Sequence, residues 1–144
     1  MSARKLIILL FLLSVVGFGA GYLMTNSYNF GICFSNLSTN AFDVSCHEVY
    51  ERVGNPLYYG MSALAIVFII LLFLPSSFSA WKKFAKWFVP LAALLFIFYP
   101  EPGSGDFFSP YPEQIFRWVS ILYIVLSVVI IARSVIKQKR TTNT

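Results

Sequence analysis

The stretch "LIILLFLLSVVGFGAGYLM", residues 6–24, decides the fold class, because it holds 19 consecutive residues without a charge. A helix rises about 1.5 Å per residue, so roughly 20 apolar residues cross the ~30 Å hydrocarbon core of a bilayer. Three further stretches are of similar length, at 57–74, 81–99 and 115–132. We therefore predict an all-α membrane protein, a bundle of four transmembrane helices that forms a single domain over residues 1–144.

The composition agrees with a membrane protein. Apolar residues make up 58% of the chain and charged residues only 12%, whereas about a quarter of the residues of a soluble domain are charged. A soluble domain of this size would have too much surface to cover with so few charges.

The stretch 81–99 is unusual, because Lys82, Lys83 and Lys86 lie near its start. Its uncharged part, 89–99, would form only about 16 Å of helix, which is too short to cross. We expect the span to include the amphipathic part, with the lysines reaching back to the headgroups. Pro90 then lies inside the span, and we expect a kink there.

The distribution of charge predicts the orientation. All six acidic residues lie in the two connections 25–56 and 100–114. The segments on the opposite side carry nine basic residues: Arg4, Lys5, Lys82, Lys83, Lys86, Arg133, Lys137, Lys139 and Arg140. Because basic residues stay on the cytoplasmic side, both termini are expected inside and both acidic loops outside, in a bacterial or archaeal cytoplasmic membrane. The excess of basic charge is explained by orientation and lipid contact, so no nucleic-acid partner is expected.

Two features of the first apolar stretch have alternatives. Arg4 and Lys5 before an apolar run also resemble a signal peptide, with Gly19 and Gly21 as small residues before a cleavage point. The run is longer than a usual signal sequence, so an uncleaved anchor is preferred. Gly17 and Gly21 form a G-x-x-x-G pair, which lets two membrane helices approach closely; packing within the chain is preferred to dimerisation.

The outer loop 25–56 contains both cysteines of the chain, Cys33 and Cys46. An outer loop lies in an oxidising compartment, so the pair is expected to form a disulfide. The bond would close a loop of about 14 residues and contribute roughly 3 kcal/mol. Ser45 and Glu48 have the spacing of a capping box, which predicts a short helix that ends at Gly54 and is anchored by the disulfide.

Cys33, "SCHEV" at 45–49 and "GNPLYYG" at 54–60 together resemble the first loop of the vitamin K epoxide reductase family. The resemblance covers fewer than 30 residues. It implies a four-helix membrane bundle that passes electrons between loop thiols and a quinone, with Cys33 and Cys46 as the loop pair. The spacing of the pair is longer than in that family. The family's membrane-embedded C-x-x-C is absent, since no cysteine follows Cys46. A structural disulfide is therefore preferred, and a redox pair, favoured by the position of Cys46 at a helix N-terminus, is the alternative.

The remaining polar residues suggest no other chemistry. His47 is the only histidine and has no partners at the spacing of a metal site, so no metal is expected. No cofactor is expected either, with a quinone as the alternative if Cys33 and Cys46 are a redox pair. The acidic residues Glu101, Asp106 and Glu113 could bind a cation or act in acid–base catalysis, but the preferred explanation is that they keep the loop 100–114 hydrated and follow the orientation rule. No charged residue lies in the middle of a span, which is unfavourable for a coupled transporter.

We therefore expect a small non-enzymatic accessory or interaction protein that presents two extracytoplasmic loops. Its partners would be the bilayer and another membrane or extracytoplasmic protein. The first alternative is a relative of the quinone-linked thiol–disulfide oxidoreductases that uses Cys33 and Cys46, and the second is a small channel-like or lipid-handling protein. The candidate interaction surface is polar and aromatic, and consists of Phe107, Phe108, Tyr111 and Glu113.

Overall fold

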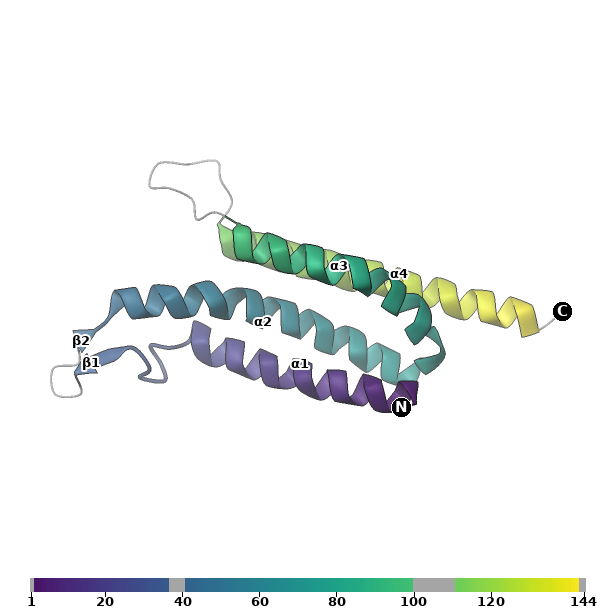
Figure 1. Cartoon of the computed structure of the whole chain (residues 1–144), viewed down its shortest axis with the longest axis horizontal. Coiled ribbons are helices and arrows are strands. Elements are labelled where there is room, and N and C mark those ends of the chain that lie inside the picture. Colours follow the sequence, from purple (N-terminus) through teal and green to yellow (C-terminus); the bar gives the residue numbers. More distant parts are fainter. Residues whose placement is uncertain (1, 37–40, 100–110, 143–144) are drawn as a thin grey trace.

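The computed structural model describes residues 2–36, 41–99 and 111–142. These residues form long helices and one small antiparallel hairpin (Figure 1). In chain order the elements are α1 (Ala3–Thr25), β1 (Phe34–Asn36), β2 (Ala41–Phe42), α2 (Val44–Phe73), the 3-10 turn η1 (Pro75–Ser77), α3 (Phe78–Phe98) and α4 (Pro112–Thr142). Apart from the hairpin, in which Phe34 pairs with Phe42 and Asn36 with Ala41, the described residues confirm the helical class.

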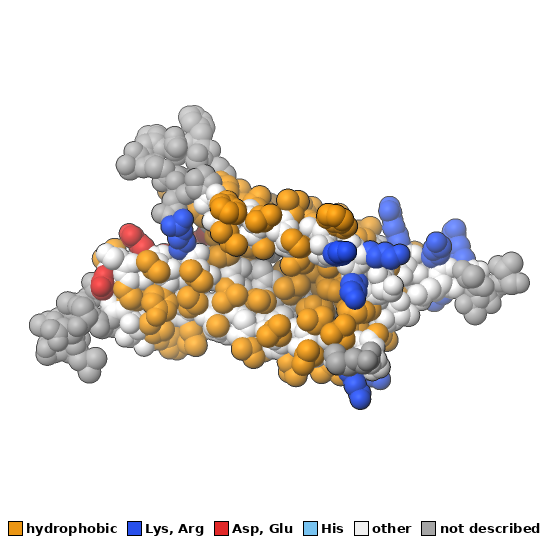
Figure 2. All heavy atoms as spheres, in the orientation of Figure 1, with side chains coloured by type: hydrophobic (Ala, Val, Ile, Leu, Met, Phe, Trp, Pro, Cys, Tyr) orange, Lys and Arg blue, Asp and Glu red, His pale blue; other side chains and the backbone are white. Residues whose placement is uncertain are grey.

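The helices form two layered pairs, α1 with α2 and α3 with α4 (Figure 1). The pairs are joined mainly by contacts between α2 and α4, whereas α3 packs on α4 and hardly approaches the backbone of α2. Both termini lie at the end opposite β1 and β2. Figure 2 shows apolar side chains covering the face between the ends, with Lys and Arg gathered near the termini. We call the end that holds the termini the basic end, and the end that holds β1 and β2 the disulfide end.

Three helices are long and apolar enough to cross a membrane: α1, α2 and the part of α4 up to Arg140. This finding agrees with an integral membrane protein. The 21-residue α3 is not among them. Its lysines Lys82, Lys83 and Lys86 are exposed. α3 nevertheless joins the amphipathic stretch and the apolar stretch in one continuous helix, as expected, with Pro90 inside it.

The expected end of the loop helix at Gly54 is wrong. A helix is present in the second half of the connection 25–56, as predicted, but α2 begins at Val44 and continues through Gly54 and Pro56 to Phe73. Gly54 serves packing rather than helix termination. A methyl group on Gly54 would lie 2.8 Å from the Met24 Cβ atom and 2.9 Å from the Thr25 backbone nitrogen. Close approach of α1 therefore explains the glycine, and the proline is tolerated within a helix stabilised by tertiary contacts.

The expected cap of this helix is also wrong. Asp43 is the N-cap of α2, and its carboxylate Oδ1 accepts a hydrogen bond of 3.2 Å from the Cys46 backbone N–H. Ser45 lies within the first turn and Glu48 further along the helix. Aspartate and serine cap helices equally well, and the extended backbone of Asp43, at φ −90° and ψ 103°, decides between them.

The last helix is longer than expected. The predicted span 115–132 lies within α4, which continues to Thr142 and includes the basic residues of the tail. In the middle of this extension, the Gln138 side chain donates a hydrogen bond of 3.3 Å to the Ser76 carbonyl oxygen. The tail is thus tied to the connection between α2 and α3.

The buried core lies in the half of the bundle nearer the basic end. Phe68 of α2 and Trp81 of α3 meet edge to face with their ring centroids 5.3 Å apart. Tyr123 of α4 packs against Phe88 at 5.3 Å. Aromatic pairs of this geometry add about 0.5–1.5 kcal/mol beyond their buried area, so near the basic end their side chains fix α3 on both α2 and α4.

Near the disulfide end, small residues bring α1 and α2 together, as the G-x-x-x-G pair predicts. A methyl group on Gly21 would lie only 2.5 Å from the Tyr58 backbone nitrogen, and one on Gly17 would lie 2.8 Å from the Met61 side chain. Gly19, on the opposite face, has nothing within 4 Å. The pair thus serves packing within the chain.

Candidate functional site at the disulfide end

The predicted disulfide is present between Cys33 and Cys46, with Cα atoms 5.7 Å apart. It joins the segment after α1 to the first turn of α2. Beside it, the Asp43 backbone N–H donates a hydrogen bond of 2.9 Å to the Cys33 carbonyl oxygen. Cys33 is buried, with 2% of its surface exposed. The bond therefore clasps the hairpin and the preceding turn onto the start of α2.

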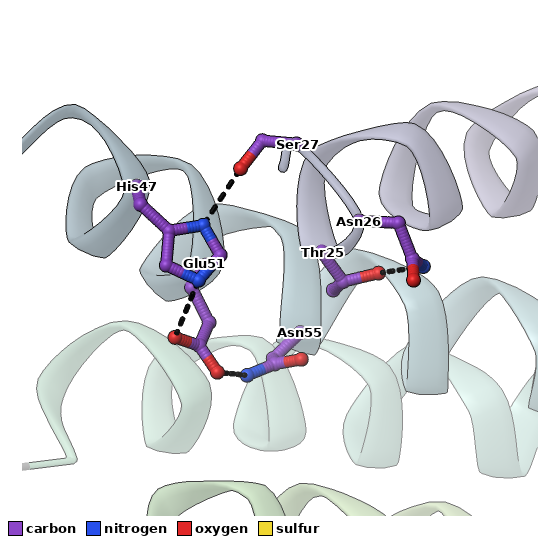
Figure 3. A network of polar contacts seen from close by, with 6 residues as sticks. All are labelled: Thr25, Asn26, Ser27, His47, Glu51 and Asn55. Atoms are coloured by element: carbon purple, nitrogen blue, oxygen red, sulfur yellow. Dashed lines mark hydrogen bonds and ion pairs between the residues drawn. The ribbon is translucent and has the colours of Figure 1, made fainter. Parts of the chain in front are cut away.

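A second connection between these segments is made by His47 (Figure 3). Its Nδ1 atom lies 2.7 Å from the hydroxyl oxygen of Ser27, which follows α1 and is fully buried. Its Nε2 atom lies 3.7 Å from a carboxylate oxygen of Glu51. The other Glu51 oxygen accepts from the Asn55 side-chain amide at 3.5 Å. Which of the Ser27 hydroxyl and Nδ1 donates in this hydrogen bond depends on the tautomer of the imidazole ring.

Ser27, His47 and Glu51 have the residue types of a nucleophile, base and acid relay. The geometry does not support that chemistry, because the Ser27 side chain has no exposed surface for a substrate to reach. His47 instead gives the buried Ser27 hydroxyl a hydrogen-bond partner, and a buried hydroxyl without a partner would be destabilising. We interpret the three residues, with Asn55, as a structural tie between the turn 26–33 and α2.

A groove lies beside this tie, with a volume of about 340 Å³. One wall is polar and comes from α2, and the other is aromatic and comes from the end of α3 and the start of α4. The lining residues are Glu48, Glu51, Arg52, Asn55, Phe96, Tyr99, Tyr111, Pro112, Glu113 and Phe116. Glu51 thus belongs both to the tie and to the groove, so the disulfide end presents a fixed, acidic and aromatic surface.

The residues predicted to form an interaction surface have different outcomes. Tyr111 and Glu113 both line the groove and are exposed. The Glu113 carboxylate also accepts a hydrogen bond of 2.7 Å from the Tyr59 hydroxyl, which ties α4 to α2. Phe107 and Phe108, like the acidic residues Glu101 and Asp106, lie outside the described residues.

In the described part of the chain, no three histidine, cysteine, aspartate or glutamate side chains are grouped so that they could hold a metal ion. The positions of Ser27, Asn55 and Tyr59 in this site were not anticipated from sequence. The spacing of His47, Glu51 and Asn55, each four residues apart, is the signal that could have shown their shared helical face. No comparable signal marks Ser27 or the Tyr59–Glu113 pair, because both connect segments far apart in the chain.

Comparison with known proteins gives no relative: no family model, no curated protein and no solved structure matches the chain.

Proposed function

We propose that this protein is a small accessory protein of a cell membrane, which crosses the bilayer four times and binds another membrane or extracytoplasmic protein through its disulfide end. The proposal rests on one observation, the groove between α2 and the α3–α4 pair, whose α2 wall is held by the disulfide and by His47. The disulfide and the His47 tie both fix the groove's α2 wall relative to the preceding segments. A preorganised polar surface with aromatic walls is typical of a site for protein recognition.

The fourth crossing is proposed for α3. The helix has 21 residues, lies beside α4 and extends between the two ends of the molecule (Figure 1). Its lysines are all at the basic end, where long side chains can reach the headgroups. Basic residues at that end and acidic ones at the other favour an orientation with both termini in the cytoplasm.

Photo-crosslinking in intact membranes tests the binding proposal. A photoreactive amino acid at Tyr111, in the groove wall, should capture one discrete partner, whereas the same group at Ile136, exposed on α4 beyond the groove, should not. Glu51→Lys should abolish the product by reversing charge in the groove. Identical products from both positions, or no product from Tyr111, would contradict the proposal.

The alternative function is thiol–disulfide exchange by Cys33 and Cys46. The position of Cys46 in the first turn of α2 favours it. Against it, Cys33 is buried, and the Asp43 carboxylate already occupies the backbone amide that could stabilise a Cys46 thiolate. Single Cys33→Ser and Cys46→Ser variants separate the functions, because a redox pair would trap mixed disulfides with a substrate through the remaining cysteine.

A further inference from the structure

A second cavity lies between α2 and α3, at the place where these two helices fail to pack on each other. Its volume is about 180 Å³. α2 contributes one side, α3 the other, and α4 the floor. The lining residues are Pro56, Leu57, Gly60, Met61, Ala63, Leu64, Phe88, Val89, Ala92, Ala93, Phe96, Val119, Ser120 and Tyr123. We call this cavity the α2–α3 cleft.

The cleft is apolar and open. No charged residue lines it, and the hydroxyl oxygens of Ser120 and Tyr123 are themselves buried, so its accessible wall is hydrocarbon. Ala63, Ser120 and Tyr123 are the buried lining residues, while the others keep part of their surface exposed. The cleft therefore opens sideways from the bundle, between the charged groups of the two ends, rather than enclosing a sealed void.

The size of the cleft limits its occupant. An apolar cavity of about 150 Å³ takes up benzene, so 180 Å³ accepts roughly six carbon atoms of one hydrocarbon chain. A helix from a partner protein or from a second copy is about 10 Å across and could cover the opening but not enter it. An acyl chain has the right width.

Lys82 and Lys86 lie on the same face of α3 as the cleft, one to two helical turns nearer the basic end. Lys82, Lys86, Val89 and Ala93 follow one another at spacings of four, three and four residues, which forms a single stripe along the helix. Val89 and Ala93 line the cleft, and Lys82 and Lys86 are exposed. The rise from Lys86 to Ala93 is about 10 Å, so the ammonium groups lie within one lipid length of the cleft.

We propose that the α2–α3 cleft binds one acyl chain of an anionic phospholipid, whose phosphate group is held by Lys82 and Lys86. The site is complementary to this molecule in both parts, since a negative headgroup meets the lysines while the chain fills the gap that α3 leaves beside α2. A bound lipid would complete the packing between α2 and α3. The proposal rests on α3 being a membrane crossing, as proposed above.

Native mass spectrometry of the full chain in detergent tests the proposal. Phosphatidylglycerol and phosphatidylcholine with identical acyl chains are titrated separately, and the retained lipid is counted. We expect one phosphatidylglycerol molecule to be retained at concentrations at which phosphatidylcholine is not. Equal retention of both lipids would overturn the headgroup assignment.

Two sets of variants locate the site. Ala93→Phe places a benzene-sized ring in the cleft and should weaken phosphatidylglycerol binding on the order of tenfold, the effect of displacing about two methylene groups. Ala20→Phe adds the same ring on an exposed position of α1 and should leave binding unchanged. Lys82→Gln and Lys86→Gln should each weaken binding roughly fivefold, while Lys139→Gln in the tail should not.

The site would be refuted if phosphatidylglycerol binding were unchanged both in Ala93→Phe and in Lys82→Gln. Loss of a dimer in Ala93→Phe, without loss of lipid, would instead identify a second copy as the occupant and overturn the proposal. Because lipid retention is measured in detergent, it does not depend on orientation. A wrong topology would appear only in the labelling of α3 in membranes, so the two failures can be distinguished.

Discussion

Replacing Gly21 with alanine should separate α1 from α2. The new Cβ atom would lie 2.5 Å from the Tyr58 backbone nitrogen, 2.8 Å from its Cα atom and 3.1 Å from the Gly54 carbonyl oxygen. Ordinary contacts begin near 3.4 Å, so the helices must part by about 1 Å. The contacting groups are backbone atoms and cannot rotate away.

The expected cost follows from this geometry. Overpacking of a well-packed interface costs about 1–3 kcal/mol, and a gap of 0.5–1 Å between helices loses a quarter to a half of the dispersion energy of the contacts that remain. Part of the cost is offset, because alanine is a better helix former than glycine by up to about 1 kcal/mol. The matched control is Gly19→Ala, which has the same helix propensity change and nothing within 4 Å.

The free energies of unfolding of the two variants in detergent, measured by circular dichroism, give the clash as their difference. We expect Gly19→Ala to equal or exceed the wild type and Gly21→Ala to be about 1–3 kcal/mol less stable than Gly19→Ala. Equal stability of the two variants would refute the close packing of α1 on α2 near the disulfide end.

Three further results are expected from the disulfide end. His47→Ala should remove the hydrogen bond to the turn after α1, at a cost of about 1 kcal/mol, and faster amide exchange should be confined to that turn. Cys33→Ser combined with Cys46→Ser should remove about 3 kcal/mol of restraint, raising proteolysis of the hairpin while the protein stays fully in the membrane fraction. Tyr59→Phe should free the start of α4 from its Glu113 contact and increase amide exchange there, with little change in overall stability because the contact is exposed.

The helices were predictable to the extent that they are apolar. The stretch 6–24 falls within α1, and the continuity of α3 through its lysines was predicted from the length that a bilayer crossing would require. The continuation of α2 past Gly54 was not predictable from local signals. Gly54 and Pro56 are typical of a helix end, but contacts with α1 outweigh those local preferences.

The candidate site was predictable only in its covalent part. The compartment of the loop predicts the bond between Cys33 and Cys46. The tie from Ser27 to His47 joins residues 20 positions apart, and the groove takes its walls from three helices. Such features depend on how helices pack, which a single sequence does not specify.

Labelling of introduced cysteines tests the central claim, that four helices cross the membrane with the disulfide end outside. Cys33 and Cys46 are bonded to each other, so one added cysteine is the only free thiol. With a membrane-impermeant maleimide on intact cells, Glu48→Cys and Tyr111→Cys should be labelled, whereas Lys83→Cys and Lys139→Cys should react only after permeabilisation. Labelling of Lys83→Cys in intact cells would contradict the account.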